Sequence, residues 1–309
     1  MKVLVTGGAG FVGSSLVRGL LERGDEVRVL DNFSTGRREN LSGLDVELVE
    51  GELRSYERVH NAVRGVEVVY HLGALGSVPR SVQDPLTSSA VNVEGTLNVL
   101  LAARDESVRR VVFSSSSSIY GSSGELPRTE QMPADPISPY GVAKLAAERY
   151  CVSFARVYHG FETVVLRYFN VFGPRQDPTS QYAAVVPLFV TAIEAGRPVT
   201  VFGDGEQSRD FTYVDNVVGA TIRAGEAEGA SGRIFNVAAG APASVNTLAD
   251  TIGRILGKPV AREHRDPRPG DVRDSWADVR EAEQVLGWRA SIDLEEGLRR
   301  TIAALDARG

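Results

Sequence analysis

The 309-residue sequence predicts an α/β protein with a doubly wound parallel sheet and a second, smaller, discontinuous α/β domain. Two observations predict this class. In the first half of the chain, short apolar segments alternate with amphipathic ones, the pattern of parallel strands joined by right-handed helical crossovers. The second half has shorter elements and more proline and glycine, which is typical of a smaller domain packed over the strand ends.

The expected strands are short, apolar and bounded by turn residues: 1–6, 26–30, 46–50, 66–72, 111–115 and 163–167. The expected helices lie between or after them, at 14–23, 92–104 and 140–159. Gly24 follows the first helical segment where a C-cap glycine belongs. The serine run 114–118 has apolar flanks, so we place it at the carboxyl end of a strand.

Composition excludes several classes of protein. A net charge of −6 and a pI near 5.4 give no basic surface for nucleic acid or anionic lipid. The single cysteine, Cys151, excludes an internal disulfide, and with only four histidines we expect no metal site. No run approaches the roughly 18 apolar residues of a membrane span. Because the chain opens on a strand and a glycine turn rather than a signal peptide, we expect a reducing, cytoplasmic compartment.

A glycine-rich turn follows the first strand. Gly7-Gly8-Ala9-Gly10-Phe11-Val12-Gly13 reads as G-x-x-G-x-x-G from Gly7 and as G-x-G-x-x-G from Gly8. Glycine is required where the turn is tight, where backbone approaches a pyrophosphate and where the helix packs on the strand. The helix that follows would direct its free N–H groups at the phosphates. The turn therefore predicts a dinucleotide site.

The end of the second strand indicates which dinucleotide. Asp31 stands about 20 residues beyond the turn, where a carboxylate accepts hydrogen bonds from an adenosine ribose and repels a 2′-phosphate. We therefore predict NAD. Arg37 and Arg38 keep NADP as an alternative.

Tyr140 and Lys144 form a Y-x-x-x-K pair, and one helical turn places them on the same face. A phenol is a poor base near neutral pH, but a neighbouring ammonium and an oxidised nicotinamide favour the phenolate and lower its pKa. Tyr140 would then take a proton from a sugar hydroxyl, with Ser116 sharing that proton.

Further stretches extend over nearly the whole chain: TGGAGFVGSSL, LDNFSTG, HLGA, NVEGTLNVL, FSSSSSIYG, SPYGVAKLAAE, RYFNVFGPRQ, FGDGEQSRDFTYVDN and RPGDVRDSWAD. With these stretches the sequence resembles the extended short-chain dehydrogenase/reductase superfamily and, within it, the UDP-hexose 4-epimerases. The resemblance implies a Rossmann-type NAD-binding domain at 1–170 with a returning segment near 211–237. Residues 171–210 and 238–309 would form the domain that binds the sugar nucleotide.

The resemblance also implies site residues. Tyr140 would be the catalytic base, Ser116 its hydrogen-bonding companion and Lys144 the lysine that positions the cofactor. NAD would contact Gly7, Gly10, Phe11, Val12, Gly13, Asp31, Asn32, Ser34, Thr35, Gly36, Leu72, Ala74, Tyr140, Lys144 and Tyr168. The UDP-sugar would contact Ser116, Ser118, Tyr140, Asn170, Val185, Arg209, Arg268, Asp271 and Ser275, with the two arginines on the diphosphate, for which their planar fork is suited.

Several chemistries in such enzymes begin with oxidation at sugar C4. Related dehydratases and decarboxylases carry a carboxylate after the serine strand end, where this chain has Ser117-Ser118. We therefore predict 4-epimerisation of a UDP-hexose through a transient 4-keto sugar, with NAD retained and regenerated in each turnover. The alternatives are a UDP-glucuronate 4-epimerase, or a decarboxylase, dehydratase or reductase of the same superfamily.

Two expectations concern substrate size and assembly. The resemblance implies that the residue at the position of Ser275 borders the 2-substituent of the hexose. Because serine is small, we predict activity on UDP-GlcNAc/UDP-GalNAc as well as on UDP-Glc/UDP-Gal. The helices near 92–104 and 144–157 carry apolar positions on more than one side. In the family the corresponding helices pair across a two-fold axis, so we expect a homodimer through a four-helix bundle. Relatives often have Gly-Asp where this chain has Gly51-Glu52, and some have lysine at Gly76.

Overall fold

A computed structural model describes residues 1–122, 125–176, 184–267 and 272–306 of the chain. Its centre is a seven-stranded, all-parallel sheet with the strand order β11-β6-β5-β4-β1-β2-β3. The strands are β1 (Lys2–Thr6), β2 (Glu26–Asp31), β3 (Val46–Glu50), β4 (Val68–His71), β5 (Arg110–Ser116), β6 (Glu162–Tyr168) and β11 (Arg233–Val237). The order reverses at β1 and β4, so their carboxyl ends border the crevice in which such sheets bind ligands.

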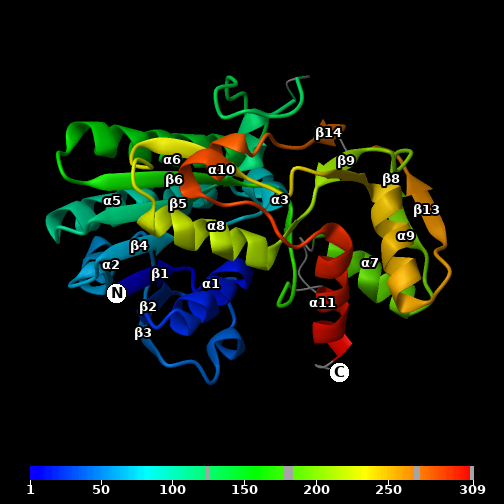
Figure 1. Cartoon of the computed structure of the whole chain (residues 1–309), viewed down its shortest axis with the longest axis horizontal. Coiled ribbons are helices and arrows are strands. Elements are labelled where there is room, and N and C mark those ends of the chain that lie inside the picture. The colour runs from blue at the N-terminus through cyan, green and yellow to red at the C-terminus, as the bar shows by residue number, and fades with distance from the viewer. Residues whose placement is uncertain (123–124, 177–183, 268–271, 307–309) are drawn as a thin grey trace.

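Helices cover both faces of this sheet (Figure 1). One face packs against α1 (Phe11–Glu22), α8 (Val214–Glu226) and α10 (Arg280–Leu286), and the other against α2 (Tyr56–Val63), α5 (Gly95–Asp105) and α6 (Pro139–Val157). Alternation along β1 explains the two cores. Val3 and Val5 join the first cluster and Leu4 the second, because successive side chains of a strand point to opposite faces.

The prediction of a doubly wound parallel sheet is confirmed. Each of the six expected strands is present, with ends shifted by no more than two residues. The helix expected from Asn92 begins inside a π-helical segment, Ala90–Glu94, that runs into α5. Gly24 follows the first helix at φ +88°, a backbone conformation that glycine adopts at little cost.

Small sheets and helices gather beyond one edge of the large sheet (Figure 1). There α7 (Val185–Glu194), α9 (Val245–Leu256) and α11 (Leu294–Asp306) share one hydrophobic cluster. The strands are β8 (Val199–Phe202) with β13 (Arg262–Arg265), and β9 (Ser208–Asp210) between β12 (Pro242–Ser244) and β14 (Asp274–Ser275). A two-stranded sheet of β7 (Val171–Phe172) and β10 (Thr212–Tyr213) lies between this cluster and the large sheet.

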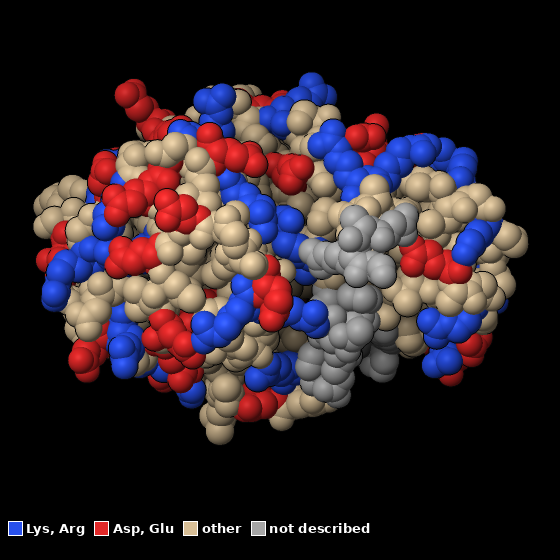
Figure 2. Space-filling view, turned by 90° about the horizontal axis from the view of Figure 1, so that it is seen from below, with Lys and Arg blue, Asp and Glu red and all other residues tan. Residues whose placement is uncertain are grey.

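Short helices complete the described chain: η1 (Arg38–Leu41), α3 (Val78–Gln83), α4 (Pro85–Ser89) and η3 (Ser117–Tyr120). The face shown in Figure 2 carries both signs of charge intermixed. Among the described residues, none of the helices combines the length and apolar character that crossing a membrane requires.

Candidate active site

The glycine turn closes tightly at the end of β1. Gly7 has φ +69°, and the N–H of Gly10 donates to the Gly7 carbonyl at 3.1 Å. A Cβ on Gly13 would lie 2.0 Å from that carbonyl oxygen, so a larger residue there would push α1 off the strand. The turn therefore brings the N-terminus of α1 close to the strand end, as a pyrophosphate site requires.

Asp31 links the turn to the second strand. Its carboxylate accepts hydrogen bonds from the N–H groups of Ala9 (2.9 Å) and Phe33 (2.8 Å). Phe33 has a positive φ of 57°, so the chain bends sharply after the carboxylate. The side chain is thereby fixed with its remaining acceptor capacity available to ribose hydroxyls.

A cavity of about 700 Å³ opens along this edge of the sheet. It is lined by all the residues expected to contact NAD, apart from Tyr140 and Lys144: Gly7, Gly10, Phe11, Val12, Gly13, Asp31, Asn32, Ser34, Thr35, Gly36, Leu72, Ala74 and Tyr168. Glu52 and Gly76, the two positions at which this chain differs from many relatives, also line this cavity. The bare glycine backbone, the fixed carboxylate and the cavity size fit a dinucleotide.

Sequence reasoning missed several residues of this cavity, including Ser77 and Arg80 in the segment after the HLGA stretch. Ser77 is the N-cap of α3, accepting from the N–H of Arg80 at 3.2 Å, and Arg80 itself lines the cavity. Arg80 lies in the first helical turn after the HLGA stretch. Because an arginine near a glycine-rich phosphate turn suits a phosphate, this position was the signal that could have identified it.

Tyr168, the last residue of β6, presents its ring to the same cavity. Its hydroxyl hydrogen-bonds the hydroxyl of Thr221 on α8 at 2.7 Å, and burial raises its pKa. Tyr168 is thus a fixed wall of the cavity.

The expected Ser116, Tyr140 and Lys144 meet where β5 ends and α6 begins. Ser116 ends β5 and caps η3 by accepting from the N–H of Ser118 at 3.2 Å. Gly141 allows the helix to approach, since a Cβ there would lie 2.8 Å from the Ser118 carbonyl. Ser116 then lies close enough to the Tyr140 phenol to lower its pKa.

The start of α6 is held by two caps. Ser138 accepts from the N–H of Gly141 at 3.1 Å, and Pro139 occupies the first turn, where its missing N–H has no cost. The N–H of Tyr140 itself donates to the hydroxyl of Ser81 on α3 at 3.0 Å. These contacts determine where the Tyr140 side chain leaves the helix.

The expected lowering of the Tyr140 pKa does not arise from the protein alone. Burial raises the pKa of the Tyr140 phenol above its usual range, and only the hydrogen bond with Ser116 lowers it. Lys144 is buried as well, and burial lowers the pKa of its ammonium to about 8. The prediction that an ammonium together with an oxidised nicotinamide lowers the Tyr140 pKa concerns the protein with its cofactor bound, and it stays a prediction.

Lys144 is held by backbone and by an aromatic ring. Its Nζ donates to the Ser114 carbonyl at 2.7 Å and lies 4.8 Å from the centroid of the Phe113 ring. Both partners belong to β5, so the ammonium anchors α6 on the strand that ends in Ser116.

A buried ion pair behind these residues was not predicted. Glu148, one turn beyond Lys144, accepts from Arg167 of β6 at 2.6 and 3.0 Å, and from the hydroxyl of Ser115 at 3.0 Å. Both members of the pair are fully buried. The sequence did offer one signal, because an acid, Glu148, stands four residues after Lys144 on the same helix. Its partner, Arg167, lies on another element, β6, and the spacing does not reveal it.

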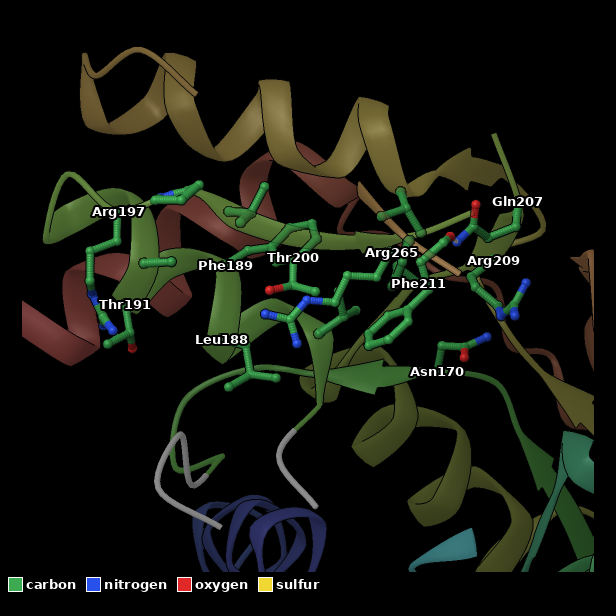
Figure 3. Close-up of a pocket in the computed structure, with 16 residues that line it drawn as sticks. Asn170, Leu188, Phe189, Thr191, Arg197, Thr200, Gln207, Arg209, Phe211 and Arg265 are labelled. Atoms are coloured by element: carbon green, nitrogen blue, oxygen red, sulfur yellow. Dashed lines mark hydrogen bonds between the residues drawn. The ribbon is translucent and has the colours of Figure 1, made fainter. Parts of the chain in front are cut away.

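A second cavity, of about 690 Å³, lies among β8, α7 and β9 (Figure 3). It brings together three of the residues expected at the sugar nucleotide, Asn170, Val185 and Arg209. Phe202, Thr200, Gln207, Phe211 and Arg265 also line it. Arginine, amide and aromatic side chains in one cavity suit a nucleotide with a diphosphate.

The remaining expected contacts have three different outcomes. Ser275 lies on β14 opposite Arg209 of β9 in a parallel pair, and Arg209 lines this cavity. The Ser118 hydroxyl is buried without a hydrogen-bond partner in the part of the chain that the structure describes. Arg268 and Asp271 lie outside the described residues.

His71 ends β4 but takes no exposed position. Its ring nitrogens lie 2.7 Å from the Thr6 hydroxyl and 3.0 Å from the Thr96 hydroxyl, and burial lowers its pKa to about 3. It is a neutral cross-link between β1, β4 and α5. Within the described residues, no three His, Cys, Asp or Glu side chains are placed to hold a metal ion.

A tight glycine turn, an aspartate fixed at the end of β2 and a Ser–Tyr–Lys set beside one parallel sheet are typical of a dinucleotide-dependent enzyme that acts on a hydroxyl-bearing carbon. The chain belongs to the NAD dependent epimerase/dehydratase family, whose model matches residues 3–238.

Relatives and solved structures are similar along the whole chain. A UDP-glucose 4-epimerase of Mycolicibacterium smegmatis is 40% identical over 98% of this chain and 97% of its own length. The UDP-glucose 4-epimerase of Thermus thermophilus, in complex with NAD, has a TM-score of 0.91 at 38% identity, covering 100% of both chains. The UDP-N-acetylglucosamine 4-epimerase of Methanobrevibacter ruminantium, in complex with UDP-N-acetylmuramic acid, has a TM-score of 0.95 at 37% identity, covering 100% of this chain and 99% of its own.

Proposed function

We propose that this protein is an NAD-dependent UDP-hexose 4-epimerase. The observation that carries the proposal is the juxtaposition of Ser116 at the end of β5 with Tyr140 and the buried Lys144 on α6, where Lys144 donates to the Ser114 carbonyl and Ser114 lines the dinucleotide cavity. The relatives named above act at C4 of UDP-hexoses.

Each residue of the set has a separate role. Tyr140 would take the proton from the C4 hydroxyl, and Ser116 would hydrogen-bond the same oxygen. Lys144 would hold the nicotinamide ribose while its bond to the Ser114 carbonyl keeps α6 in place. When bound, NAD would supply hydride acceptance and return at C4. The positive nicotinamide would also favour the phenolate, which burial alone disfavours.

The site lacks what competing reactions need. Elimination of water or loss of CO₂ requires acids or bases beside C5 and C6, and the residues after the strand end are Ser117 and Ser118 in η3. We propose that the Ser118 hydroxyl, which is buried and unpartnered in the described part of the chain, meets a sugar hydroxyl once the substrate is bound. NADP is disfavoured because Asp31 is fixed at the ribose position, while Arg38 is engaged by Glu50 and the ring of Phe33.

For the substrate range, we infer that both neutral and N-acetylated UDP-hexoses enter. Ser275 is a small residue paired in register with Arg209, which lines the second cavity. A related structure of 37% identity is a UDP-N-acetylglucosamine 4-epimerase. Arg175 donates to the Ser15 hydroxyl of α1 at 2.7 Å, so a contact within the protein engages this guanidinium.

We assign the diphosphate and uridine to the second cavity, with Arg209 and Asn170 at its inner end. Residues 1–170 and the returning segment 211–237 would bind NAD, and 171–210 with 238–309 would bind the sugar nucleotide. The roles of Arg268 and Asp271, and the cytoplasmic location, stay predictions.

A homodimer is the assembly that we propose. Exposed apolar side chains cluster on α3, α4 and α6, with Leu86 83%, Val82 63%, Val157 62% and Val142 54% exposed. The three helices pack on one another. We propose that α5 and α6 pair with the same helices of a second copy, which would form a four-helix bundle and remove part of the exposed apolar surface from water.

The test is an assay of purified protein on UDP-glucose, UDP-GlcNAc and UDP-glucuronate, following product and NADH together. We expect UDP-galactose and UDP-GalNAc to form to equilibrium with no net NADH. Steady accumulation of NADH, of a 4-keto sugar or of CO₂ would contradict the proposed function. No turnover of either N-acetyl sugar would contradict the inference from Ser275.

A further inference from the structure

Asp210, the last residue of β9, is a fully buried carboxylate outside the catalytic set. Its Oδ1 accepts from the N–H of Ala239 at 2.8 Å, and its Oδ2 accepts from the N–H groups of Gly240 at 3.0 Å and Ala277 at 3.3 Å. One side chain thus joins three segments that are far apart in the sequence.

Each joined segment leads to a wall of the proposed substrate site. Ala239 and Gly240 follow β11 of the large sheet, Ala277 follows Ser275 of β14, and Asp210 itself follows Arg209. The guanidinium of Arg209 also depends on this arrangement, since its Nη1 donates to the carbonyls of Ser208 (2.8 Å) and Arg273 (2.9 Å), the second just before β14.

A fourth segment is attached through the backbone. The Asp210 carbonyl accepts from Nδ2 of Asn170 at 3.4 Å, and the Asn170 carbonyl accepts from the N–H of Thr212 at 3.2 Å. In Figure 3, Asn170 and Arg209 lie near each other at one end of the cavity.

Resting on the proposed function, we propose that Asp210 is the positioning residue of the UDP-sugar site: its carboxylate holds Arg209, Asn170 and Ser275 in register with the large sheet that carries Tyr140's partner Ser116. It touches neither the reacting carbon nor the cofactor. It acts through the residues that would bind the diphosphate and border the hexose.

Only a carboxylate satisfies this arrangement. An asparagine at 210 has one acceptor oxygen, and its amide nitrogen would face backbone N–H groups from one of the two segments. Because two N–H donors repel each other, either the Ala239–Gly240 segment or the segment at Ala277 would move away from residue 210. Burial raises the pKa of the Asp210 carboxyl to about 6 although the N–H donors lower it, so the charge is retained at a cost in stability.

The experiment measures UDP binding by calorimetry, together with kcat and KM for UDP-glucose, well above pH 6. For Asp210→Asn we expect UDP affinity to fall and KM to rise about tenfold, the effect of leaving one buried donor unsatisfied. We expect kcat at saturating sugar and the NAD content to stay near wild type. If Asp210→Asn does not fold, Asp210→Ser, which leaves room for water at the N–H groups, takes its place with the same expectation.

Asp25→Asn is the matched control. Asp25 is also buried and accepts from Arg23 Nε at 2.6 Å, but it precedes β2, at the opposite end of the large sheet. We expect that variant to lose stability without changing UDP affinity or KM. UDP binding as tight in both Asp210 variants as in wild type overturns the positioning role and leaves the proposed function intact. Wild-type protein that binds UDP but forms no epimer overturns the proposed function while the UDP comparison still decides the role of Asp210.

Discussion

The Nζ of Lys144 donates to the main-chain carbonyl of Ser114 at 2.7 Å, which fastens the catalytic helix to β5 two residues before Ser116. The same burial that makes this contact rigid removes the ammonium from water, and it lowers the pKa of Lys144 to about 8. Lys144 therefore serves the site at the expense of stability.

Replacing Lys144 by Met should stabilise the cofactor-free protein at pH 7. The pKa of Lys144 is lower in the folded state than its ordinary 10.5, so folding is penalised below pH 8, and the penalty disappears as pH rises from 8 to 10.5. This pKa shift lowers the free energy of unfolding of wild type by about 3 kcal/mol at pH 7. The variant would avoid that penalty but lose the hydrogen bond to Ser114, which contributes about 1 kcal/mol.

Urea unfolding of cofactor-free wild type and Lys144→Met at pH 7 and pH 10 measures this difference. We expect the variant to be more stable by about 2 kcal/mol at pH 7, with most of the advantage gone at pH 10, and to bind NAD more weakly. If Lys144→Met gains less stability over wild type at pH 7 than at pH 10, burial does not lower the pKa of Lys144 in the folded protein.

Tyr140→Phe should remove turnover while leaving the fold. The change deletes only the hydroxyl that hydrogen-bonds Ser116, and loss of a general base costs about 10²–10⁴ in rate. The measurement is kcat for UDP-glucose with NAD content and circular dichroism as controls. Turnover within a factor of a few of wild type would exclude Tyr140 from proton transfer.

Ser275→Tyr should narrow the substrate range. A phenol ring on β14 beside Arg209 would fill the space that we assign to the 2-substituent of the hexose. We expect the variant to retain activity on UDP-glucose and to lose most activity on UDP-GlcNAc; the ratio of the two kcat/KM values measures it. An unchanged ratio would mean that Ser275 does not border the hexose.

Introducing negative charge on the exposed apolar side chains of α4 and α6 should separate the two subunits of the proposed dimer. Leu86→Glu with Val142→Glu places carboxylates on α4 and α6, where desolvation on pairing would be costly. We expect light scattering to show a dimeric wild type and a monomeric double variant. The control is Leu48→Glu, which changes an exposed apolar residue on the edge strand β3 and should leave the dimer intact. A monomeric wild type would contradict the assembly.

The parts of the fold that follow from local sequence were predictable. Alternation, glycine and turn residues give β1, the phosphate-binding turn and Asp31 in the right places, because each depends on short, local patterns in the chain. The short strand β9 and the parallel pairing of β14 with it carry no such periodic signal. The strands β9 and β14 are two or three residues long, and their pairing joins residues more than 60 positions apart.

The candidate site was predictable where one motif contains the whole contact. Tyr140 and Lys144 lie on one helix, and Ser116 on the strand beside it. Glu148 with Arg167, and Asp210 with Ala239, are contacts between elements, and sequence alone does not show which buried acid meets which donor. The raised pKa of Tyr140 in the cofactor-free protein was not predicted for a related reason, since burial depends on tertiary packing.

The central claim, that hydrogen leaves C4 and returns to the same carbon from the opposite face, is tested by UDP-glucose deuterated at C4. With wild-type enzyme in ordinary water, the account predicts UDP-galactose that keeps its deuterium at C4. Deuterium lost to solvent, or product formed without passage through C4 oxidation, would contradict it.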